Sequence, residues 1–438
     1  MASSYISRNQ SSNGSGKLTI SVWLKHCEAA EQLVVTSYYS GDYWGDLRFL
    51  SDGAIKFQDY RNSYIFQLQT TAKFLDPASW YHVVVNFDNT LASPTGKIYV
   101  NGVLQDLATT NQYSQNETSS FLTDYTLNIG TYNSGSNWNG SMADLYYIQG
   151  QVYEASTFGS INSTSGEWKP NPSPTIDYSS TGNNSFHMKF EDASNLDLDS
   201  GDNTLTFSTT GSPTQNVDTP DNNFATWNPL VAQGDTFTNG NTTVARSASS
   251  FRSAFSTIAL PSTGKFYCEF KRGSGNLVYL GIADDKEGGC VDLQNRGQES
   301  QVGANANSVS YLASDGRSTI NNSADTSYGA SFSSSNVIGM AVDMTNMKLY
   351  FSKDGVFQNS GVPTSGSTGT GALAIPTTTG TYFVAAGFNA SGVDVNFGNG
   401  TFGTTVITSA GTGASTPGTF EYDVPTGYQP LTTKGLNV

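Results

Sequence analysis

The chain has 438 residues, of which 13% are charged, and a formal net charge of −15. An acidic field of this size repels phosphate backbones, so nucleic acid is not an expected partner. No segment approaches the ~18 consecutive apolar residues of a membrane span, and the start of the sequence has no apolar stretch, so neither membrane insertion nor a signal peptide is expected. Abundant Gly, Ser, Thr, Asn, Tyr and Phe predict an all-β protein of short strands and tight turns.

Residues 1–160 predict a series of strands separated by turns. Apolar and polar residues alternate over 17–26, as in a strand with one face toward a core. Hairpins are predicted around Asp52-Gly53 and Asn101-Gly102, because these dipeptides favour the tight turns that join antiparallel strands. Further strands are expected at 79–88, 125–130 and 141–153.

Residues 161–230 predict an ordered connector between two domains. Pro170, Pro172 and Pro174 interrupt regular strand pairing. Large apolar residues recur along the segment, which argues against a flexible tether. They are Trp168, Phe186, Phe190, Phe224 and Trp227.

Residues 231–438 return to the composition of strands and predict a second domain. The expected strands lie at 264–273, 277–284, 336–358, 381–389 and 393–398. No helical period is sustained long enough to form a coiled-coil shaft.

The first segment resembles laminin-G-like domains of the concanavalin A-like class. The similarity lies in SVWLKH, SWYHVVVNFD, KIYVNGV and NGSMADLYYIQGQVY, which occur in the order seen in that family. The third segment resembles a SPRY domain, above all in NVIGMAVDMTNMKLYFSKDGV. These resemblances imply two concanavalin A-like antiparallel β-sandwiches, or jelly rolls, and a SPRY-like module that binds through its loops without catalysis.

The whole chain resembles structural proteins of bacteriophages, particularly marine ones. SSYISRNQSS near the start and DTPDNNFATWNPL at the domain junction carry this similarity. It implies a virion location with other virion proteins as partners, and by analogy a homo-trimer, but leaves tail and capsid positions open. The cysteines, Cys27, Cys268 and Cys290, are few and odd in number, which fits synthesis in a reducing host cytoplasm.

Catalytic signatures are missing from the predicted strands, so an enzyme is not expected. Retaining glycosidases need two carboxylates ~5 Å apart, whereas Glu269 stands alone and the adjacent Glu191 and Asp192 point to opposite faces of a strand. The histidines have neither metal-ligand nor triad spacing. They are His26, His82 and His187.

An acidic turn provides the best candidate for a metal site. Asp197, Asp199 and Asp202 supply closely spaced oxygen ligands around a glycine, the chemistry that Ca²⁺ prefers. The alternative is a solvated acidic turn, and no other cofactor is expected.

Two loops of the first domain have the composition of a sugar site, with aromatic faces for pyranose rings and polar groups for hydroxyls. They span 38–46 and 131–140. The aromatic candidates are Tyr39, Tyr43, Trp44, Tyr132 and Trp138, and the polar ones are Asp42, Asn137 and Asn139. The alternative is that Trp44 and Trp138 cap the ends of the core.

Loops of the second domain, at 283–290 and 312–319, provide a further candidate surface. Its candidate residues are Asp284, Asp285, Tyr311 and Arg317. Simple solvation is the alternative for each of them. Three functions stay open: a virion protein that binds host glycans or receptors, a decoration or head-fibre protein that contacts other virion proteins, and a glycan hydrolase.

Overall fold

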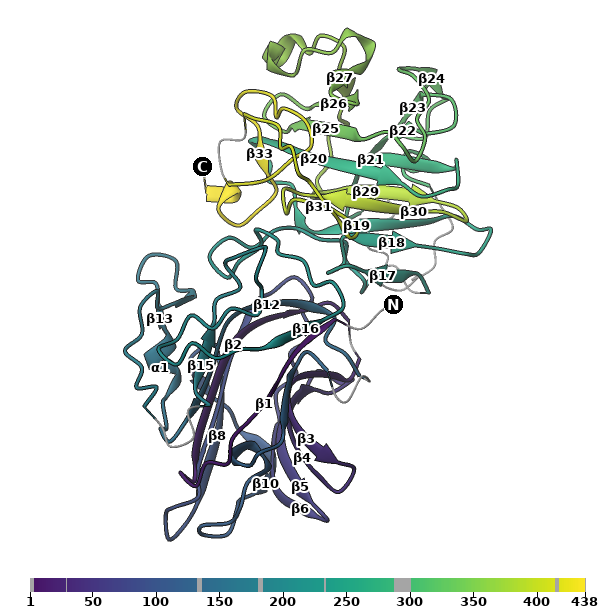
Figure 1. The fold of residues 1–438 in the computed structure, drawn as a ribbon. Helices are drawn as coiled ribbons and strands as arrows, with labels where there is room; N and C mark the ends of the chain where they lie inside the picture. Colours follow the sequence, from purple (N-terminus) through teal and green to yellow (C-terminus); the bar gives the residue numbers. More distant parts are fainter. Residues whose placement is uncertain are drawn as a thin grey trace. The chain divides into compact units, whose positions relative to one another are not determined.

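The computed structural model describes residues 4–28, 30–131, 136–179, 184–231, 234–286, 301–413 and 417–437. The chain folds into two compact units, Met1–Gln215 (unit 1) and Asn216–Val438 (unit 2) (Figure 1). Both are built from β-sheets, and the one α-helix of the described ranges is the single turn α1 (Ala155–Phe158). No helix in these ranges is long and apolar enough to cross a membrane. The protein is therefore all-β, as its composition predicts.

An eight-stranded antiparallel sheet forms one layer of unit 1. Its order is β10 (Leu107–Asn111), β6 (Tyr64–Thr70), β5 (Ile55–Arg61), β4 (Tyr43–Phe49), β3 (Gln32–Ser40), β11 (Thr126–Ile129), β1 (Tyr5–Asn9) and β16 (Ser208–Thr210). Neighbouring strands β3 to β6 follow one another in sequence, so tight hairpins join them.

A six-stranded antiparallel sheet forms the other layer of unit 1. Its order is β15 (Phe186–Met188), β12 (Gly140–Gln149), β2 (Lys17–His26), β7 (Tyr81–Asp88), β8 (Thr95–Val100) and β9 (Val103–Leu104). Val100 pairs with Val103, which leaves Asn101-Gly102 as a two-residue turn with positive φ at both positions. The predicted hairpin is confirmed, since Asn and Gly tolerate this left-handed conformation.

The main core of unit 1 lies between these sheets. Val22 and Val85 of the six-stranded sheet belong to the same buried cluster as Phe57 and Leu68 of the eight-stranded sheet. The opposite face of the six-stranded sheet is also covered, by α1 and by residues such as Trp168 from the pair β13 (Gly159–Ile161) and β14 (Trp168–Pro170). Strand β2 is consequently buried on both of its faces.

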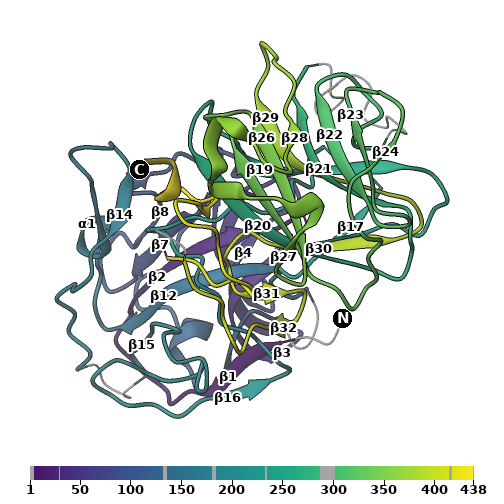
Figure 2. The same cartoon turned by 90° about the horizontal axis from the view of Figure 1, so that it is seen from above.

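Unit 2 contains two further sheets. The nine-stranded sheet comprises β17 (Thr236–Thr238), β18 (Thr243–Ala245), β30 (Gly392–Asn396), β20 (Lys265–Arg272), β25 (Ile338–Asp343), β26 (Lys348–Lys353) and β27 (Val356–Phe357), with β28 (Leu373–Ala374) on β26 and β33 (Gln429–Pro430) on β20. The six-stranded sheet runs β19 (Arg252–Ala259), β29 (Tyr382–Phe388), β21 (Val278–Asp284), β22 (Ser308–Leu312), β23 (Arg317–Ile320) and β24 (Thr326–Ser327) (Figure 2). A small hairpin joins β31 (Thr401–Phe402) to β32 (Thr405–Val406).

The core of unit 2 again draws residues from both large sheets. Phe270 and Met340 of the nine-stranded sheet share one buried cluster with Leu280 and Val384 of the six-stranded sheet. Trp227 is fully buried in the same cluster and contacts the ring of Phe270.

The segment 161–230, predicted as a connector, is divided between the two units at Gln215. Phe186 lies in strand β15 of unit 1, whereas Phe224 and Trp227 are fully buried in unit 2. Most of the apolar residues that argued against a flexible tether therefore contribute to the packing of one unit or the other.

Candidate functional site

Two hairpin turns of the eight-stranded sheet lie side by side at one end of unit 1. The β3–β4 turn contains Asp42, and the β5–β6 turn contains Asn62. The backbone N–H of Asn62 donates to the carbonyl of Asp42 at 2.8 Å, and its side-chain Nδ2 donates to the Tyr43 hydroxyl at 2.7 Å. These contacts join the predicted loop 38–46 to a second turn that the sequence did not single out.

Three tyrosines gather at this end of the sheet. Tyr39 stacks on Tyr125, with ring centroids 5.1 Å apart and planes 22° from parallel. Tyr43 meets Tyr39 edge-on at 6.4 Å. Tyr39 is 68% exposed, although its ring is held by these contacts. An exposed aromatic ring with a fixed orientation is what stacking on a pyranose requires.

Arg61, the last residue of β5, lies against two of these rings. Its guanidinium carbon is 5.3 Å from the ring centre of Tyr43 and 5.9 Å from that of Tyr125. Among the described residues its side chain makes neither a hydrogen bond nor an ion pair, and Nη1 is buried without a partner. Tyr39, Tyr43, Arg61 and Tyr125 are called the tip cluster below.

Trp44 belongs to a different aromatic group on the outer face of the same sheet. Its ring stacks on Tyr60 at 5.4 Å, meets Tyr64 edge-on at 6.1 Å, and lies 5.6 Å from the guanidinium carbon of Arg48. Its indole N–H donates to the carbonyl of Gly41 at 3.1 Å. Trp44 is therefore engaged within the protein to a greater extent than Tyr39.

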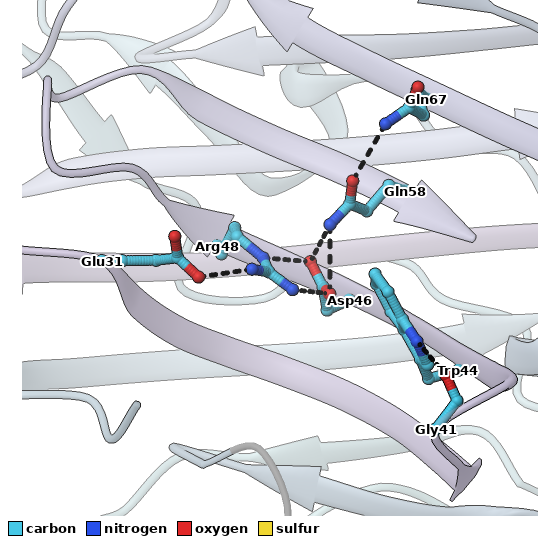
Figure 3. A network of polar contacts seen from close by, with 7 residues as sticks. All are labelled: Glu31, Gly41, Trp44, Asp46, Arg48, Gln58 and Gln67. Atoms are coloured by element: carbon cyan, nitrogen blue, oxygen red, sulfur yellow. Dashed lines mark hydrogen bonds and ion pairs between the residues drawn. The ribbon is translucent and has the colours of Figure 1, made fainter. Parts of the chain in front are cut away.

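A network of polar side chains lies beside Trp44 (Figure 3). Arg48 forms paired hydrogen bonds to the fully buried carboxylate of Asp46 and a further ion pair with Glu31. The amide of Gln58 donates to Asp46, and that of Gln67 donates to Gln58 at 3.2 Å. Because a carboxylate only accepts hydrogen bonds, Asp46 fixes the orientation of both amides.

Burial and pairing have opposing effects on this ion pair. Burial raises the pKa of Asp46, although hydrogen bonds from Arg48 and Gln58 act in the opposite direction. For Arg48, burial opposes the charged form, but its hydrogen bonds and charge attraction to Asp46 and Glu31 outweigh this, and its pKa is raised. The pair is a structural element of the sheet, and Asp46 has no oxygen facing solvent.

In the second loop predicted for sugar binding, 131–140, the described candidate side chains contact other residues of unit 1. Trp138 is half-buried against the core and contacts the ring of Phe49 at 5.8 Å, as expected for a residue that caps the core. Asn137 accepts a hydrogen bond from Thr131, and Asn139 donates to Glu28. Tyr132 lies outside the described residues.

The acidic turn does not assemble a metal site. Asp199 is buried, and its carboxylate accepts backbone N–H groups of His187, Gly201 and Leu205. Asp197 accepts from Thr209, and Asp202 is exposed. No group of three His, Cys, Asp or Glu side chains that could hold a metal ion occurs in the part of the chain that the structure describes. Asp199 orders the turn by accepting its backbone donors, and the spacing that suggested Ca²⁺ does not bring the carboxylates of the described aspartates together.

The four candidates of unit 2 do not form one surface. Tyr311 is fully buried, contacts Phe332 and Phe351, and donates its hydroxyl to the carbonyl of Ala330, so its assignment as a binding residue is wrong. Its position in strand β22 directs the ring into the core.

The other three candidates of unit 2 have separate surroundings. Asp284 is fully buried and accepts hydrogen bonds from Asn307 and Thr378, which ties β21 to a neighbouring loop. Asp285 accepts the backbone N–H of Thr381 at 2.8 Å. Arg317 is exposed and pairs with Asp315 at 3.3 Å.

The side chains considered for catalysis form hydrogen bonds that hold the fold together. Glu269 is buried, and burial raises its pKa to about 7, while the backbone N–H groups of Glu421 and Tyr422 donate to its two oxygens. His82 lies 2.9 Å from the Ser21 hydroxyl, but its Nδ1 accepts the indole N–H of Trp168. The ring proton must then sit on Nε2, so Nε2 cannot accept the serine proton as a catalytic base would.

The other histidines and acidic residues considered for catalysis also lie apart from one another. His26 packs against Phe49 and Tyr81, and burial lowers its pKa. His187 stacks on Tyr146 with ring centroids 3.7 Å apart. Glu191 and Asp192 are both exposed and follow the end of β15, so they do not lie on opposite faces of a strand as predicted, and Cys290 lies outside the described residues.

Comparisons with known proteins found a family match and similar solved structures. Residues 1–153 match the family described as the concanavalin A-like lectin/glucanases superfamily, which agrees with the two facing sheets of unit 1. No curated protein matches the chain in sequence. Similar solved structures include a human SPRY domain, with 17% identity over 35% of this chain and 90% of that one and a TM-score of 0.27.

Two other solved structures have comparable similarity. The SPRY domain of human HERC1 has 13% identity over 39% of this chain and 96% of that one, with a TM-score of 0.30. The native heptameric SAP-like pentraxin from Limulus polyphemus has 15% identity over 35% of this chain and 72% of that one, with a TM-score of 0.27.

Arg61, Asn62 and Tyr125 were missed by the sequence interpretation. A local signal existed at the first two, because Asn62 and Ser63 are turn formers that follow a predicted strand. Tyr125 gave no such signal. It reaches the tip cluster because β11 pairs with β3, which brings Thr126 opposite Tyr38.

Proposed function

We propose that this chain is a non-catalytic binding protein, displayed on the outside of a bacteriophage particle, whose unit 1 binds a host-surface glycan through the tip cluster. The observation that carries the proposal is the exposed ring of Tyr39, held by Tyr125 and flanked by Arg61. Protein–sugar recognition combines an aromatic face with nearby directional polar groups, and both are present here.

The geometry favours binding because the ring of Tyr39 is ordered before any ligand arrives. Stacking on Tyr125 limits the conformational entropy that the ring would lose on binding. Asp42 and Asn62 supply polar groups on the two adjoining turns. Virion display is supported by the sequence resemblance to phage structural proteins.

Binding is tested with the full chain on an array of bacterial surface glycans, followed by titration of the best ligand in solution. Tyr39→Ala is expected to weaken binding about tenfold, since the variant loses the stacking face. Leu104→Ala is the matched control, because Leu104 is 55% exposed on edge strand β9 of the other sheet. If no glycan binds, or if both variants bind like the wild type, glycan recognition at the tip cluster is refuted.

A structural virion protein is the second candidate, and exposed apolar side chains favour it. Val103 and Leu104 on β9 are 63% and 55% exposed, and Ile161 on β13 is 67% exposed. Exposed apolar residues mark a surface that another protein covers where they form one continuous patch. Under this hypothesis Val103→Asp reduces incorporation of the chain into purified particles, measured by mass spectrometry, whereas Tyr39→Ala does not.

A further inference from the structure

We infer that the glycan bound at the tip cluster carries a carboxylate, and that Arg61 is the residue that recognises it. This inference rests on the proposed function and specifies its ligand. It starts from the unused hydrogen-bonding capacity of one guanidinium group.

Arg61 differs from other arginines of the described chain in what its guanidinium contacts. Arg48 pairs with Asp46 and Glu31, Arg246 with Asp235, and Arg272 donates to several backbone carbonyls. Arg61 contacts only aromatic rings, and its Nη1 is buried without a partner. A guanidinium carries five N–H donors, and leaving them unused in a partly buried position is costly.

The two tyrosines hold the guanidinium next to the exposed ring of Tyr39. Tyr43 and Tyr125 each contact Arg61, and each also contacts Tyr39. A sugar stacked on Tyr39 therefore brings its ring substituents close to Arg61. Contacts with aromatic rings do not occupy the N–H donors of the guanidinium in hydrogen bonds, and arginine uses these donors in parallel pairs to bind a planar oxyanion.

Neither of the two nearby aspartates, Asp59 and Asp42, neutralises the guanidinium of Arg61. Asp59, two residues earlier on β5, is buried and accepts hydrogen bonds from Tyr113, Ser119 and Ser120. Asp42 lies on the adjoining turn and forms no ion pair with Arg61. An unpaired cation beside an exposed aromatic ring complements an anionic ligand locally, although the net charge of −15 opposes the approach of anions to the chain as a whole.

The test compares three probes on the full chain. They are an oligouronide, the same oligosaccharide with methyl-esterified carboxylates, and an oligosaccharide that carries sulfate esters but no carboxylate. We expect the wild type to prefer the oligouronide over its ester by about tenfold or more. Arg61→Gln is expected to abolish this preference while retaining binding of the ester, and Arg61→Lys to restore part of it. Lys97→Gln, which removes the same charge from the six-stranded sheet, is the control.

Each outcome separates the two proposals. Equal wild-type affinity for acid and ester refutes the carboxylate but leaves glycan binding intact. Stronger binding of the sulfated probe overturns the carboxylate assignment in favour of a sulfate ester. Absence of binding to all probes and to the array refutes the proposed function itself. Unfolding curves of Arg61→Gln and Arg61→Lys, matched to the wild type, exclude loss of fold as the cause.

Discussion

The indole N–H of Trp168 donates to Nδ1 of His82 across 2.9 Å. The contact joins the segment after the first predicted domain to β7 of the six-stranded sheet, and His82 also stacks on Trp23 with ring centroids 4.7 Å apart. Because Nδ1 accepts, the imidazole is neutral with its proton on Nε2, which faces Ser21. Both nitrogens are thus used in the neutral ring, and a second proton has no place.

The first prediction concerns acid stability through His82. Burial lowers its pKa from 6.5 to about 3, so below pH 6.5 the unfolded chain binds a proton that the folded chain does not. The stabilising contribution is complete above pH 6.5 and falls as the pH drops toward 3, by on the order of 5 kcal/mol in total. Chemical denaturation of the wild type and His82→Gln at several pH values measures it. Parallel pH profiles of the two proteins would show that His82 titrates normally.

A second prediction concerns the buried pair of Asp46 and Arg48. Arg48→Met leaves the Asp46 carboxylate buried without its cation, and we expect a loss of about 3–5 kcal/mol in unfolding free energy. The double variant Asp46→Leu/Arg48→Met removes both charges and should lose less than the sum of the single variants. A double-mutant cycle by urea denaturation provides the measurement. Additive losses would mean that the two groups do not stabilise each other.

The third prediction concerns Glu269 in unit 2. Its folded pKa of about 7 exceeds the ordinary 4.5, so between these values the folded chain holds a proton that the unfolded chain releases. Its contribution is complete below pH 4.5 and is lost as the pH rises through 7, by roughly 3 kcal/mol. The unfolding free energy of the wild type should therefore fall relative to that of Glu269→Gln between pH 4.5 and 7. A constant difference over this range contradicts the raised pKa.

The fourth prediction separates two residues that the sequence placed in the same candidate surface. Tyr311→Ala removes a fully buried ring and is expected to cost about 3–5 kcal/mol. Arg317→Ala removes an exposed side chain and should change stability by less than about 0.5 kcal/mol. Thermal unfolding of both variants distinguishes the core residue from the surface residue. A small effect of Tyr311→Ala would contradict its place in the core.

Local features of the sequence were sufficient to predict the fold class. The strand at 17–26 and the turn at Asn101-Gly102 are confirmed, because strand periodicity and turn preference depend on residues adjacent in the chain, although the strand is buried on both faces and not on one. The aromatic residues Tyr39 and Tyr43 were predicted as binding candidates for the same reason, since they lie within a polar, glycine-containing turn.

Tertiary structure alone decided what surrounds these residues. Arg61 and Tyr125 join Tyr39 only through the pairing of β3 with β11 and the alignment of two hairpin turns. The sequence next to Tyr311 has the composition of a loop, yet the pairing of β22 with β21 directs the Tyr311 ring into the core. Burial and cross-strand neighbours depend on contacts between distant segments, and such contacts leave no periodic signal in the sequence near any one residue.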